Sequence, residues 1–343
     1  MKADTQKMQS INGKTVLITG GTGSFGKHFI QEALSRYQPR RLIVFSRDEL
    51  KQHELRVRWP DSRLEFFLGD VRDCDRLRRA FQAQIDVVIH AAALKQVPAC
   101  EYNPFEAIKT NVLGAKNVID AAIDCAVPKV LALSTDKAVN PVNLYGATKL
   151  CAEKLFVQGN SYAGGKNTRF SCVRYGNVLG SRGSVVPLFR SQRETGSITL
   201  TDPRMTRFWL TLEQAVALVI ECIGVMEGGE VFVPHIPSMR LEDMARAMAP
   251  HSKLNYTGVR PGEKLHEILI SRDEARHAVS SDNLFIIKPE FPWWGSNNWI
   301  DGIPLPEDFS FESDSNDRWL SDNEFLALIG ESLDVPRLST AGR

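Results

Sequence analysis

The chain has 343 residues, of which 43% are hydrophobic and 24% are charged, and its formal net charge at neutral pH is +1. This length allows one large domain or two intimate ones, and the balanced charge gives no sign of a nucleic-acid-binding protein. The N-terminal stretch MKADTQKMQSINGK lacks the apolar core of a signal peptide. The most apolar helical stretch, LEQAVALVIECIGVM (212–226), is too short and too charged to span a bilayer. We therefore expect a cytoplasmic protein without membrane or nucleic-acid partners.

Short hydrophobic segments alternate with helix-like stretches in the first half of the chain. Helices are predicted at KHFIQEALSRY (27–37) and CDRLRRAFQA (74–83). This alternation is typical of an α/β fold with a doubly wound parallel sheet, and right-handed crossovers favour a Rossmann-type arrangement. The predicted strands are KTVLIT (14–19), RLIVFS (41–46), LEFFLGD (64–70), DVVIHAA (86–92), KVLALST (129–135) and TRFSCVRY (168–175).

The alternation weakens after about residue 178. Beyond it we predict a helix at 212–226, a strand at EVFVPH (230–235) and a helix at LEDMARAMA (241–249). The aromatic residues of the stretch 291–319 argue against disorder, and we expect it to wrap a surface of this chain or of a neighbouring subunit. The expected domains are a dinucleotide-binding Rossmann domain (10–178, with a return near 205–235), a smaller, mainly substrate-binding lobe (179–290) and a C-terminal extension (291–343).

The six cysteines are spread along the chain and form no C-x-x-C pair. The sequence therefore predicts neither a metal site nor a dithiol redox centre. We expect reduced cysteines that serve in packing, namely Cys74, Cys100, Cys125, Cys151, Cys172 and Cys222.

The stretch TGGTGSFG (19–26) follows the first predicted strand and opens a helix. Its glycines allow a tight turn, close approach of the backbone to a pyrophosphate and close helix–strand packing, and the free N–H groups of the helix N-terminus attract phosphate. A tight turn without a ligand is the alternative. Because strand, loop and helix come in the required order, we predict nucleotide binding by Gly20, Gly23, Ser24, Phe25 and Gly26.

The end of the second predicted strand bears on the choice of cofactor. NAD sites usually carry Asp or Glu here to bind the ribose 2′-OH, whereas this chain has Ser46 and Arg47, which suit a 2′-phosphate. We predict NADP over NAD; a solvated Arg47 is the alternative. Small alanines at the end of the fourth predicted strand would let the backbone approach the cofactor. The alternative is that they serve tight packing of a buried strand. The expected cofactor contacts beyond the glycine loop are Ser46, Arg47, Asp48, Lys51, Asp70, Val71, Ala91, Ala92, Ala93, Lys95, Tyr145 and Lys149.

Tyr145 and Lys149 are four residues apart and face the same way on a helix. An ammonium beside a phenol lowers the pKa of the tyrosine, so Tyr145 is a candidate general base for a substrate hydroxyl while a hydride leaves the same carbon. Alone, such a pair is more often a chance pair on a solvated helix. Here it follows a nucleotide-binding pattern and a strand ending in Ser134 and Thr135, at the edge where Rossmann domains bind ligands.

Several motifs together resemble the extended short-chain dehydrogenases/reductases: TGGTGSFG, the S-T-D-K stretch and Y-G-A-T-K. More narrowly, the chain resembles the inverting UDP-N-acetylglucosamine 4,6-dehydratases of pseudaminic-acid-type sugar biosynthesis. This resemblance runs from about residue 10 to 290 and includes NDRWLS (316–321). It implies NADP, a UDP-sugar substrate and a homo-oligomer. The motifs that carry it are SRDELKQ (46–52), AALKQVP (92–98), STDKAVNP (134–141), RYGNVLGSRGSV (174–185) and RPGEK (260–264).

The resemblance also implies a redox-neutral cycle. Tyr145 would take the 4-hydroxyl proton as the C4 hydride passes to NADP⁺, Lys149 would hold the nicotinamide ribose and tune Tyr145, and Thr135 would bond O4. The 4-ketone makes the C5 proton acidic. One of Asp136 and Lys137 would remove it and the other would protonate the departing C6 hydroxyl, after which hydride returns to C6 and C5 is reprotonated.

The division of labour between Asp136 and Lys137 stays open at this stage. Related dehydratases that retain configuration carry Glu at the position of Lys137. A basic Lys137 must be neutral; burial and the cations Lys149 and Lys95 favour this, while a bound diphosphate opposes it. We favour Lys137 as the C5 base and Asp136 as the C6 acid. The reverse assignment and an inconsequential surface pair are the alternatives.

Further substrate contacts are predicted within the matching motifs. Arg207 and Arg260 are candidates for a clamp on the UDP diphosphate, because Arg offers forked donors to phosphate. Glu263 would accept from the uridine ribose, and Asn177 and Lys95 would lie beside the substrate. Each residue also has a structural alternative as a salt-bridge or packing residue.

Two other functions, a nucleotide-sugar 4-epimerase and an NADP-sensing protein, are alternatives to the dehydratase. A nucleotide-sugar 4-epimerase needs Tyr145 and Lys149 but has no use for an acid/base pair at Asp136 and Lys137. A catalytically silent NADP-sensing protein has no reason to keep Tyr145, Lys149 and Thr135 together.

Overall fold

The computed structural model describes residues 10–181, 184–290, 299 and 301–331, so parts of the expected C-terminal extension lie outside the described residues. Two compact units are distinguished and are described separately. Unit 1 comprises residues 1–176, 212–235 and 268–312, and unit 2 comprises residues 177–211, 236–267 and 313–343. Among the described helices, none has the length and apolar composition needed to cross a membrane.

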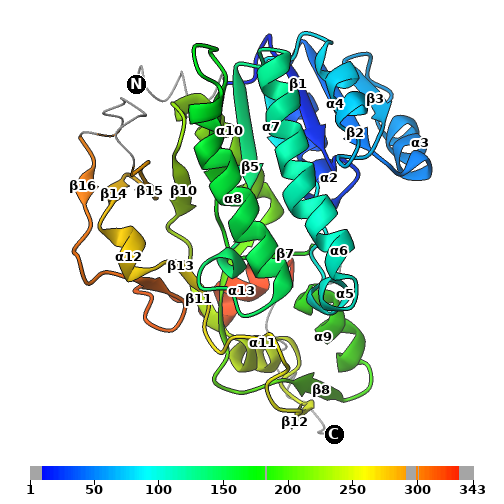
Figure 1. Ribbon diagram of the computed structural model, residues 1–343. Helices are drawn as coiled ribbons and strands as arrows, with labels where there is room; N and C mark the ends of the chain where they lie inside the picture. Colours follow the sequence, from blue (N-terminus) through cyan, green and yellow to red (C-terminus); the bar gives the residue numbers. More distant parts are fainter. Residues whose placement is uncertain (1–9, 182–183, 291–298, 300, 332–343) are drawn as a thin grey trace, which may run out of the picture. The chain divides into compact units, whose positions relative to one another are not determined.

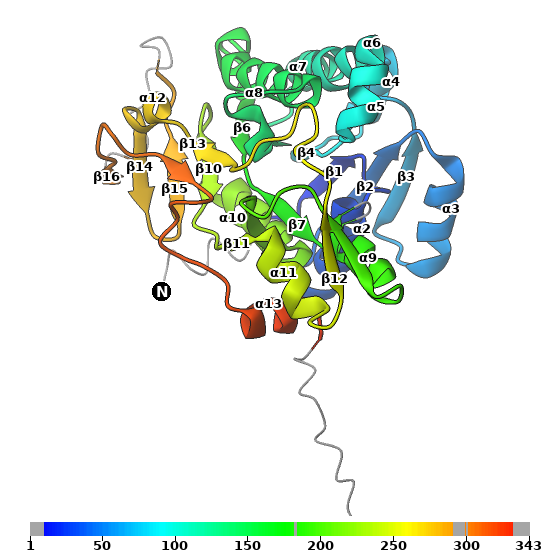
Figure 2. The same cartoon turned by 90° about the horizontal axis from the view of Figure 1, so that it is seen from below.

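A ten-stranded sheet forms the centre of unit 1 in the part that the structure describes. Strands β3, β2, β1, β4, β5, β6 and β10 run parallel in that order, and β15, β14 and β16 continue the sheet antiparallel (Figures 1 and 2). The strand bounds are β1 Thr15–Thr19, β2 Arg41–Ser46, β3 Leu64–Leu68, β4 Val87–His90, β5 Lys129–Leu133, β6 Arg169–Val173, β10 Val231–Pro234, β14 Ala278–Ser281, β15 Leu284–Ile287 and β16 Ile303–Pro304.

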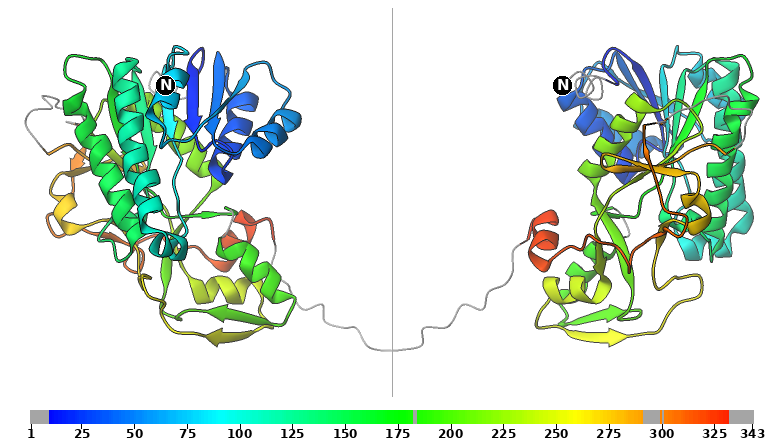
Figure 3. Two further views of the ribbon diagram at one scale, coloured as in Figure 1. Left: turned by 45° about the vertical axis from the view of Figure 1, so that its right-hand side comes forward. Right: turned by 90° about the vertical axis from the view of Figure 1, so that its left-hand side faces the viewer.

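Helices cover both faces of this sheet (Figure 3, right). On one face α2 (Ser24–Arg36) packs against α10 (Leu212–Val225), and on the other α4 (Cys74–Phe81), α7 (Gly114–Asp124) and α8 (Leu144–Tyr162) pack in a row. Strands β1, β4 and β10 are buried along their whole length, as expected for a sheet covered on both sides. The predicted doubly wound Rossmann-type fold is confirmed, and the strand order reverses at β1 and β4, where such folds bind ligands.

Shorter elements complete unit 1. They are α3 (Glu49–Arg58), α5 (Val97–Tyr102), α6 (Pro104–Ala107), the π-helix η1 (Ile108–Leu113), the 3₁₀ helix η2 (Asp136–Ala138), β13 (Ile268–Ile270), α12 (Arg272–Ala275) and β17 (Phe311–Glu312). β17 pairs with β13, and β16 pairs with β14. These described parts of the stretch 291–319 therefore lie against strands of the same chain.

Unit 2 has its own sheets and core. A three-stranded sheet, β11–β9–β7, and the pair β12–β8 are packed with α9, α11 and α13 around Trp209, Phe189 and Phe325. The bounds are β7 Asn177–Leu179, α9 Val185–Arg193, β8 Ser197–Leu200, β9 Thr206–Thr211, β11 Ser238–Arg240, α11 Leu241–Met248, β12 Lys253–Tyr256 and α13 Asp322–Leu328. The structure assigns residues 268–290 to unit 1, which differs from the boundary expected from the sequence, because β14 and β15 extend the large sheet.

The cysteines follow the packing expectation only in part. Cys100, Cys172 and Cys222 are buried, whereas Cys151 is exposed on α8. The expectation was wrong for Cys151, because its position on the helix turns away from the face that α8 lays on the sheet.

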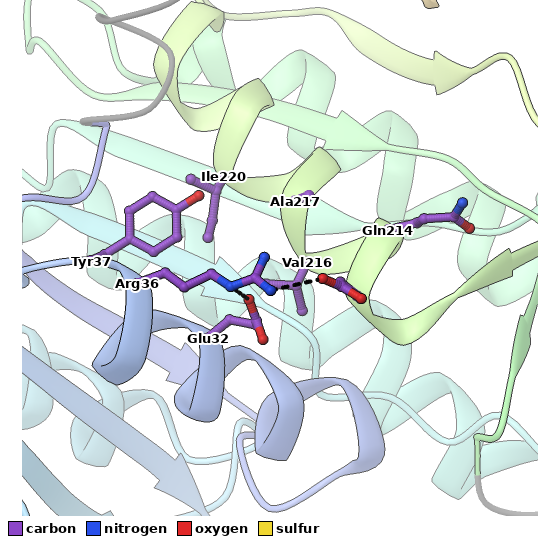
Figure 4. Close-up of a pocket in the computed structure, with 8 residues that line it drawn as sticks. Glu32, Arg36, Tyr37, Gln214, Val216, Ala217 and Ile220 are labelled. Carbon is purple, nitrogen blue, oxygen red and sulfur yellow. Dashed lines mark ion pairs between the residues drawn. The ribbon is translucent and has the colours of Figure 1, made fainter. Parts of the chain in front are cut away.

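A small pocket of about 240 Å³ lies between α2 and α10 in unit 1 (Figure 4). Val216, Ala217, Ile220 and the ring of Tyr37 give it apolar walls, and Arg36 forms ion pairs with Glu32 and Glu213 at 3.1 Å. No predicted site residue lines this pocket.

Candidate active site

The glycine loop lies at the carboxyl end of β1. Gly20 has a φ of +69°, and a Cβ there would lie 2.9 Å from the backbone of Ala92, so the turn and the close approach both require glycine. A Cβ at Gly26 would overlap the backbone of Gly21. The helix α2 begins at Ser24, after Gly23, without a side-chain cap. This is the arrangement that binds phosphate at a helix N-terminus.

The end of β2 presents a cation and a hydroxyl. Asp48 is the N-cap of α3: it accepts from the backbone N of Lys51 at 3.0 Å and pairs with the Lys51 ammonium. Gln52, which the sequence did not single out, donates to the hydroxyl and the carbonyl of Ser46, both at 3.0 Å. The Arg47 guanidinium is more than half exposed and lies 3.6 Å from Asp70. The carboxylate of Asp48 is thus used by the helix.

Asp70 is held by two arginines. Arg72 donates to it at 2.7 Å, and Arg47 lies further away. Burial raises the pKa of Asp70, but the hydrogen bonds and charge of Arg72 outweigh it and the pKa is lowered overall. Asp70 is therefore an anion at neutral pH that orients Arg47.

The loop after β4 is tied to α8 by a residue that sequence reasoning missed. Asn111, buried in the π-helix η1, accepts from Leu94 N at 2.8 Å and donates to Leu94 O at 2.9 Å and to Thr148 Oγ1 at 3.0 Å. A π-helical turn is a common feature of functional sites. The sequence around it, EAIKTNVL (106–113), contains other polar residues and does not single out Asn111.

Beneath this loop, His90 and Thr19 link β4 to β1. Thr19 Oγ1 accepts from Ala92 N at 3.3 Å and lies 2.9 Å from His90 Nδ1. Burial, together with the charge of Lys149, lowers the pKa of His90 to about 3. The imidazole is therefore neutral and serves packing and loop placement.

Thr135, Asp136 and Lys137 form one hydrogen-bonded cluster after β5. Asp136 is fully buried, and its Oδ1 accepts from Thr135 Oγ1 at 2.9 Å and from Lys137 Nζ at 3.0 Å. Its backbone N donates to the carbonyl of Tyr175 at 3.1 Å. The second oxygen, Oδ2, makes no hydrogen bond to the described residues. A buried oxygen of this kind is a candidate partner for a ligand.

Gly146 allows η2, which holds Asp136 and Lys137, to pack closely against the first turn of α8. A Cβ at Gly146 would overlap the carbonyl oxygen of Lys137 and lie 3.1 Å from Pro141. The neighbouring Tyr145 is buried against Cys100 and Ala107. The Y-G sequence thus places the phenol and the η2 residues side by side.

The electrostatics of Tyr145 differ from the expectation that a lysine depresses its pKa. Burial raises the pKa to about 12, the charge of Lys137 lowers it, Asp136 raises it, and a hydrogen bond with Thr135 lowers it. Desolvation of a buried phenolate outweighs the cation. Lys149 is buried too, and its Nζ donates to Leu133 O at 2.6 Å.

The predicted substrate residues of unit 2 fall into two kinds. Arg207 is buried, and its guanidinium donates to the carbonyls of Thr206, Leu265 and Lys264 at 2.6, 2.9 and 3.0 Å. This is the structural alternative, because the donors expected to clamp a diphosphate hold the backbone instead. By contrast, Arg260 is exposed and lies 3.9 Å from Glu263.

Two residues of unit 2 that were predicted to contact substrate each have a buried oxygen without a hydrogen-bond partner among the described residues: Oδ1 of Asn177 and Oε2 of Glu263. Buried acceptors usually have a hydrogen-bond partner. A bound ligand that donates to these two oxygens would explain why they have none within the protein. Lys95, in unit 1, is exposed.

Comparison with known proteins identifies the family. Residues 16–289 match the family described as "Polysaccharide biosynthesis protein". A protein of Campylobacter jejuni (strain 81-176) named UDP-N-acetylglucosamine 4,6-dehydratase (inverting) is 49% identical over 330 residues, which cover 94% of this chain and 98% of that protein. The chain belongs to this dehydratase family. The resemblance predicted from the sequence motifs is thereby confirmed.

Other similarities place the dehydratase family within a wider group. A crystal structure of Pen from Bacillus thuringiensis has a TM-score of 0.86 and 40% identity, covering 93% of this chain and 98% of that one. A protein of Rickettsia akari named UDP-glucose 4-epimerase is 43% identical over 277 residues, 77% of this chain and 80% of that protein. Identity and coverage are both higher for the Campylobacter dehydratase.

Proposed function

We propose that this chain is an NADP-dependent enzyme that dehydrates UDP-N-acetylglucosamine at C4/C6 with inversion at C5, giving a UDP-4-keto-6-deoxy-L-arabino-hexose. The observation that carries the proposal is the cluster of Thr135, Asp136 and Lys137 beside Tyr145, because it adds an acid/base pair to a redox site. Family membership supports the reaction type. A role in pseudaminic-acid-type biosynthesis, a cytoplasmic location and a homo-oligomeric state stay predictions.

The proposed cofactor is a nicotinamide dinucleotide, and more specifically NADP. Solved dehydratases and epimerases with this fold hold a nicotinamide dinucleotide, and the glycine loop suits its pyrophosphate. For NADP, the support is that Asp48 caps α3 while Arg47 and Ser46 stand at the strand end. When bound, the dinucleotide supplies a hydride acceptor that later returns the hydride, and the positive charge of its oxidised ring favours a nearby phenolate.

In the redox step, Tyr145 takes the proton of the 4-hydroxyl and Thr135 holds O4. The buried phenol needs the cations around it, because desolvation alone raises its pKa. Lys149 holds the ribose of the dinucleotide and contributes positive charge. The C4 hydride leaves in the same step, so the sugar gains a 4-ketone and an acidic C5 proton.

In the elimination step, one proton transfer within the Asp136–Lys137 pair prepares both catalysts. Across 3.0 Å, the ammonium of Lys137 passes a proton to the carboxylate of Asp136, which gives a neutral amine and a neutral acid. Lys137 then removes the C5 proton and Asp136 protonates the C6 hydroxyl, which leaves as water. The hydride would return to C6. One proton, equal in number to the one that Tyr145 took from the 4-hydroxyl and exchangeable with solvent, would reach C5 on the opposite face, so the net change is the loss of one water.

Four residues are proposed as substrate contacts. Arg260 would pair with the diphosphate, Glu263 with the uridine ribose, and Asn177 and Lys95 would lie beside the sugar. The unpartnered oxygens of Asn177 and Glu263 support this reading. Arg207 is left out of the clamp, because its guanidinium holds backbone carbonyls.

The test is incubation with UDP-N-acetylglucosamine and NADP in D₂O. Dehydration gives a 4-keto-6-deoxy product that has lost one water and carries deuterium at C5. A product of unchanged mass would point instead to a 4-epimerase, the second candidate that the Rickettsia relative favours. Absence of turnover with any UDP- or dTDP-hexose would contradict both functions.

The assignment of the C5 base has its own test. In Lys137→Ala we expect NADP and UDP-sugar binding to persist and exchange of the C5 proton to be lost. Normal deuterium incorporation in this variant would remove Lys137 from the base role.

A further inference from the structure

Glu153 is a buried carboxylate that the proposed mechanism does not use. It follows Tyr145 and Lys149 on α8 at successive spacings of four residues, so the three side chains lie along one face of the helix. Glu153 is only 2% exposed. A carboxylate this deep in the protein needs cationic or hydrogen-bonding partners.

Arg174, which follows β6, supplies these partners. Its Nε and Nη2 donate to the two carboxylate oxygens of Glu153 at 3.1 and 2.6 Å. The other edge of the guanidinium donates to Glu274 at 3.0 and 2.7 Å, and Nη1 also bonds Leu269 O at 2.8 Å. Two carboxylates thus share one guanidinium, and the triad of Glu153, Arg174 and Glu274 keeps one surplus negative charge.

This surplus charge faces a buried ammonium. Burial lowers the pKa of Lys149, whereas negative charge at Cys172 and Glu153 raises it. Burial also holds the pKa of the Cys172 thiol well above its usual value, so this thiol is neutral near pH 7. Glu153 is the carboxylate that acts on Lys149, and the two hydrogen bonds from Arg174 hold it one helical turn away.

Groups from several elements surround the Tyr145–Lys149 pair. The neutral His90 and Cys172 face Lys149 from the sheet, and the cluster at Asp136 and Lys137 faces Tyr145 from η2. The full set of titratable or charged groups is His90, Cys100, Asp136, Lys137, Tyr145, Lys149, Glu153, Cys172, Arg174 and Tyr175.

We propose that Glu153, fixed by Arg174 and Glu274, is a positioning residue that keeps Lys149 protonated in its buried place. The inference rests on the proposed function in one respect: a charged Lys149 is what holds the ribose and favours the phenolate of Tyr145. The geometry of the triad makes the role specific, since Arg174 uses one edge to aim Glu153 and the other edge to hold Glu274.

Glu153→Gln and Glu274→Gln are a matched pair of variants. Each keeps the side-chain size and removes one carboxylate from Arg174. Glu274 also forms the capping box of α12 with Ser271, so its loss should lower Tm at least as much. Only Glu153 lies one turn from Lys149, so only its loss should change the charge of that lysine strongly.

The readout is NMR of the full chain carrying isotope-labelled lysine, followed against pH. The Lys149 signal is the one that Lys149→Met removes, and its titration requires neither substrate nor cofactor. We expect Glu153→Gln to lower the Lys149 midpoint by about one pH unit, a tenfold change in proton affinity. Glu274→Gln should move it less despite an equal or greater loss of Tm.

Turnover provides the second readout. The basic limb of activity against pH should move to lower pH in Glu153→Gln, together with the NMR midpoint. Equal midpoints in Glu153→Gln and the wild type, or equal shifts in both variants, would overturn the proposal and leave Glu153 a structural residue. If the wild type does not turn over UDP-N-acetylglucosamine but Glu153→Gln still lowers the Lys149 midpoint, the proposed reaction is contradicted and the role of Glu153 is supported.

Discussion

At the scale of single residues, Asp136 is the residue for which we propose the most contacts within the site. Its Oδ1 is bonded by Thr135 and Lys137, and its Oδ2 has no partner among the described residues. The bonded oxygen fixes the orientation of the carboxyl group, and the other is the one that we propose meets a substrate hydroxyl. One residue can therefore exchange a proton with Lys137 and deliver it to C6.

Asp136→Asn should separate oxidation from loss of water. The amide keeps the shape of the side chain but cannot give a proton, so we expect dehydration to fall by at least about 100-fold. Hydride transfer at C4 should persist. Stopped-flow absorbance of reduced nicotinamide, with mass spectrometry of the product, measures the two steps. Dehydration at the wild-type rate in this variant would remove Asp136 from the acid role.

Arg47 should decide the preference between NADP and NAD. Its exposed guanidinium is proposed to meet the 2′-phosphate, and a hydrogen bond to a charged group is worth about 1.5–3 kcal/mol. Arg47→Ala should therefore raise the Kd for NADP by at least about tenfold and leave that for NAD unchanged, as measured by calorimetry. Arg79→Ala, at an exposed arginine that contacts Gln82, controls for net charge. Equal losses for both cofactors would contradict the 2′-phosphate contact.

At the scale of elements, the strand–turn–helix unit from β5 to α8 carries the proposed chemistry. Residue Thr135 caps η2, η2 packs on the first turn of α8, and Lys149 reaches back to the end of β5 at Leu133 O. The contact between η2 and α8 depends on Gly146, because any side chain there meets the carbonyl of Lys137. The spacing of the redox and elimination groups is thus fixed by one glycine.

Gly146→Ala should damage stability and activity together. The added methyl overpacks the η2–α8 contact at a cost of about 1–3 kcal/mol, and η2 must shift away from Tyr145. Thermal unfolding and turnover measure the two effects. Gly165→Ala is the matched control, since a Cβ there meets no atom within 4 Å. Wild-type turnover in Gly146→Ala would show that the spacing is not set by this contact.

At the scale of the whole molecule, distant segments are joined inside unit 1 by buried charges. Arg174 connects α8 with the segment of β13 and α12, about 100 residues away in the chain. Removing one partner of such a buried network leaves an uncompensated charge, which typically costs about 3–5 kcal/mol. The network therefore ties β13 and α12 to α8.

Acid should weaken this network through Glu274. Burial would raise its pKa, but the charge and hydrogen bonds of Arg174 lower it below the ordinary value of 4.5. A lowered folded-state pKa means that the stabilisation is complete above the unfolded pKa and is lost as pH falls through the folded one. Urea unfolding should show a steady free energy down to about pH 5 and a decline below it. Glu274→Gln should flatten that decline; an unchanged slope would contradict the assignment.

The sequence by itself determined three features: the doubly wound parallel sheet, the glycine loop, and the residues that make up the proposed catalytic cluster. Short apolar runs that alternate with helix-like stretches predict buried parallel strands, and the run at 41–46 coincides with β2. The stretch 133–149 is one strand, one turn and one helix, so its side chains come together through local geometry alone. For this reason Thr135, Asp136, Lys137, Tyr145 and Lys149 were visible as a group.

Tertiary structure alone decided the features that depend on distant partners and on burial. The sequence left Arg207 open as a phosphate binder or a structural residue, and its carbonyl partners come from residues about 60 positions away. It gave no sign of the carboxylate partners of Arg174. The raised pKa of Tyr145 and the orphan oxygen of Asp136 follow from desolvation, which packing creates and no local motif encodes. Glu153 gained its proposed role in the same way, because its charge matters only where water is excluded around Lys149.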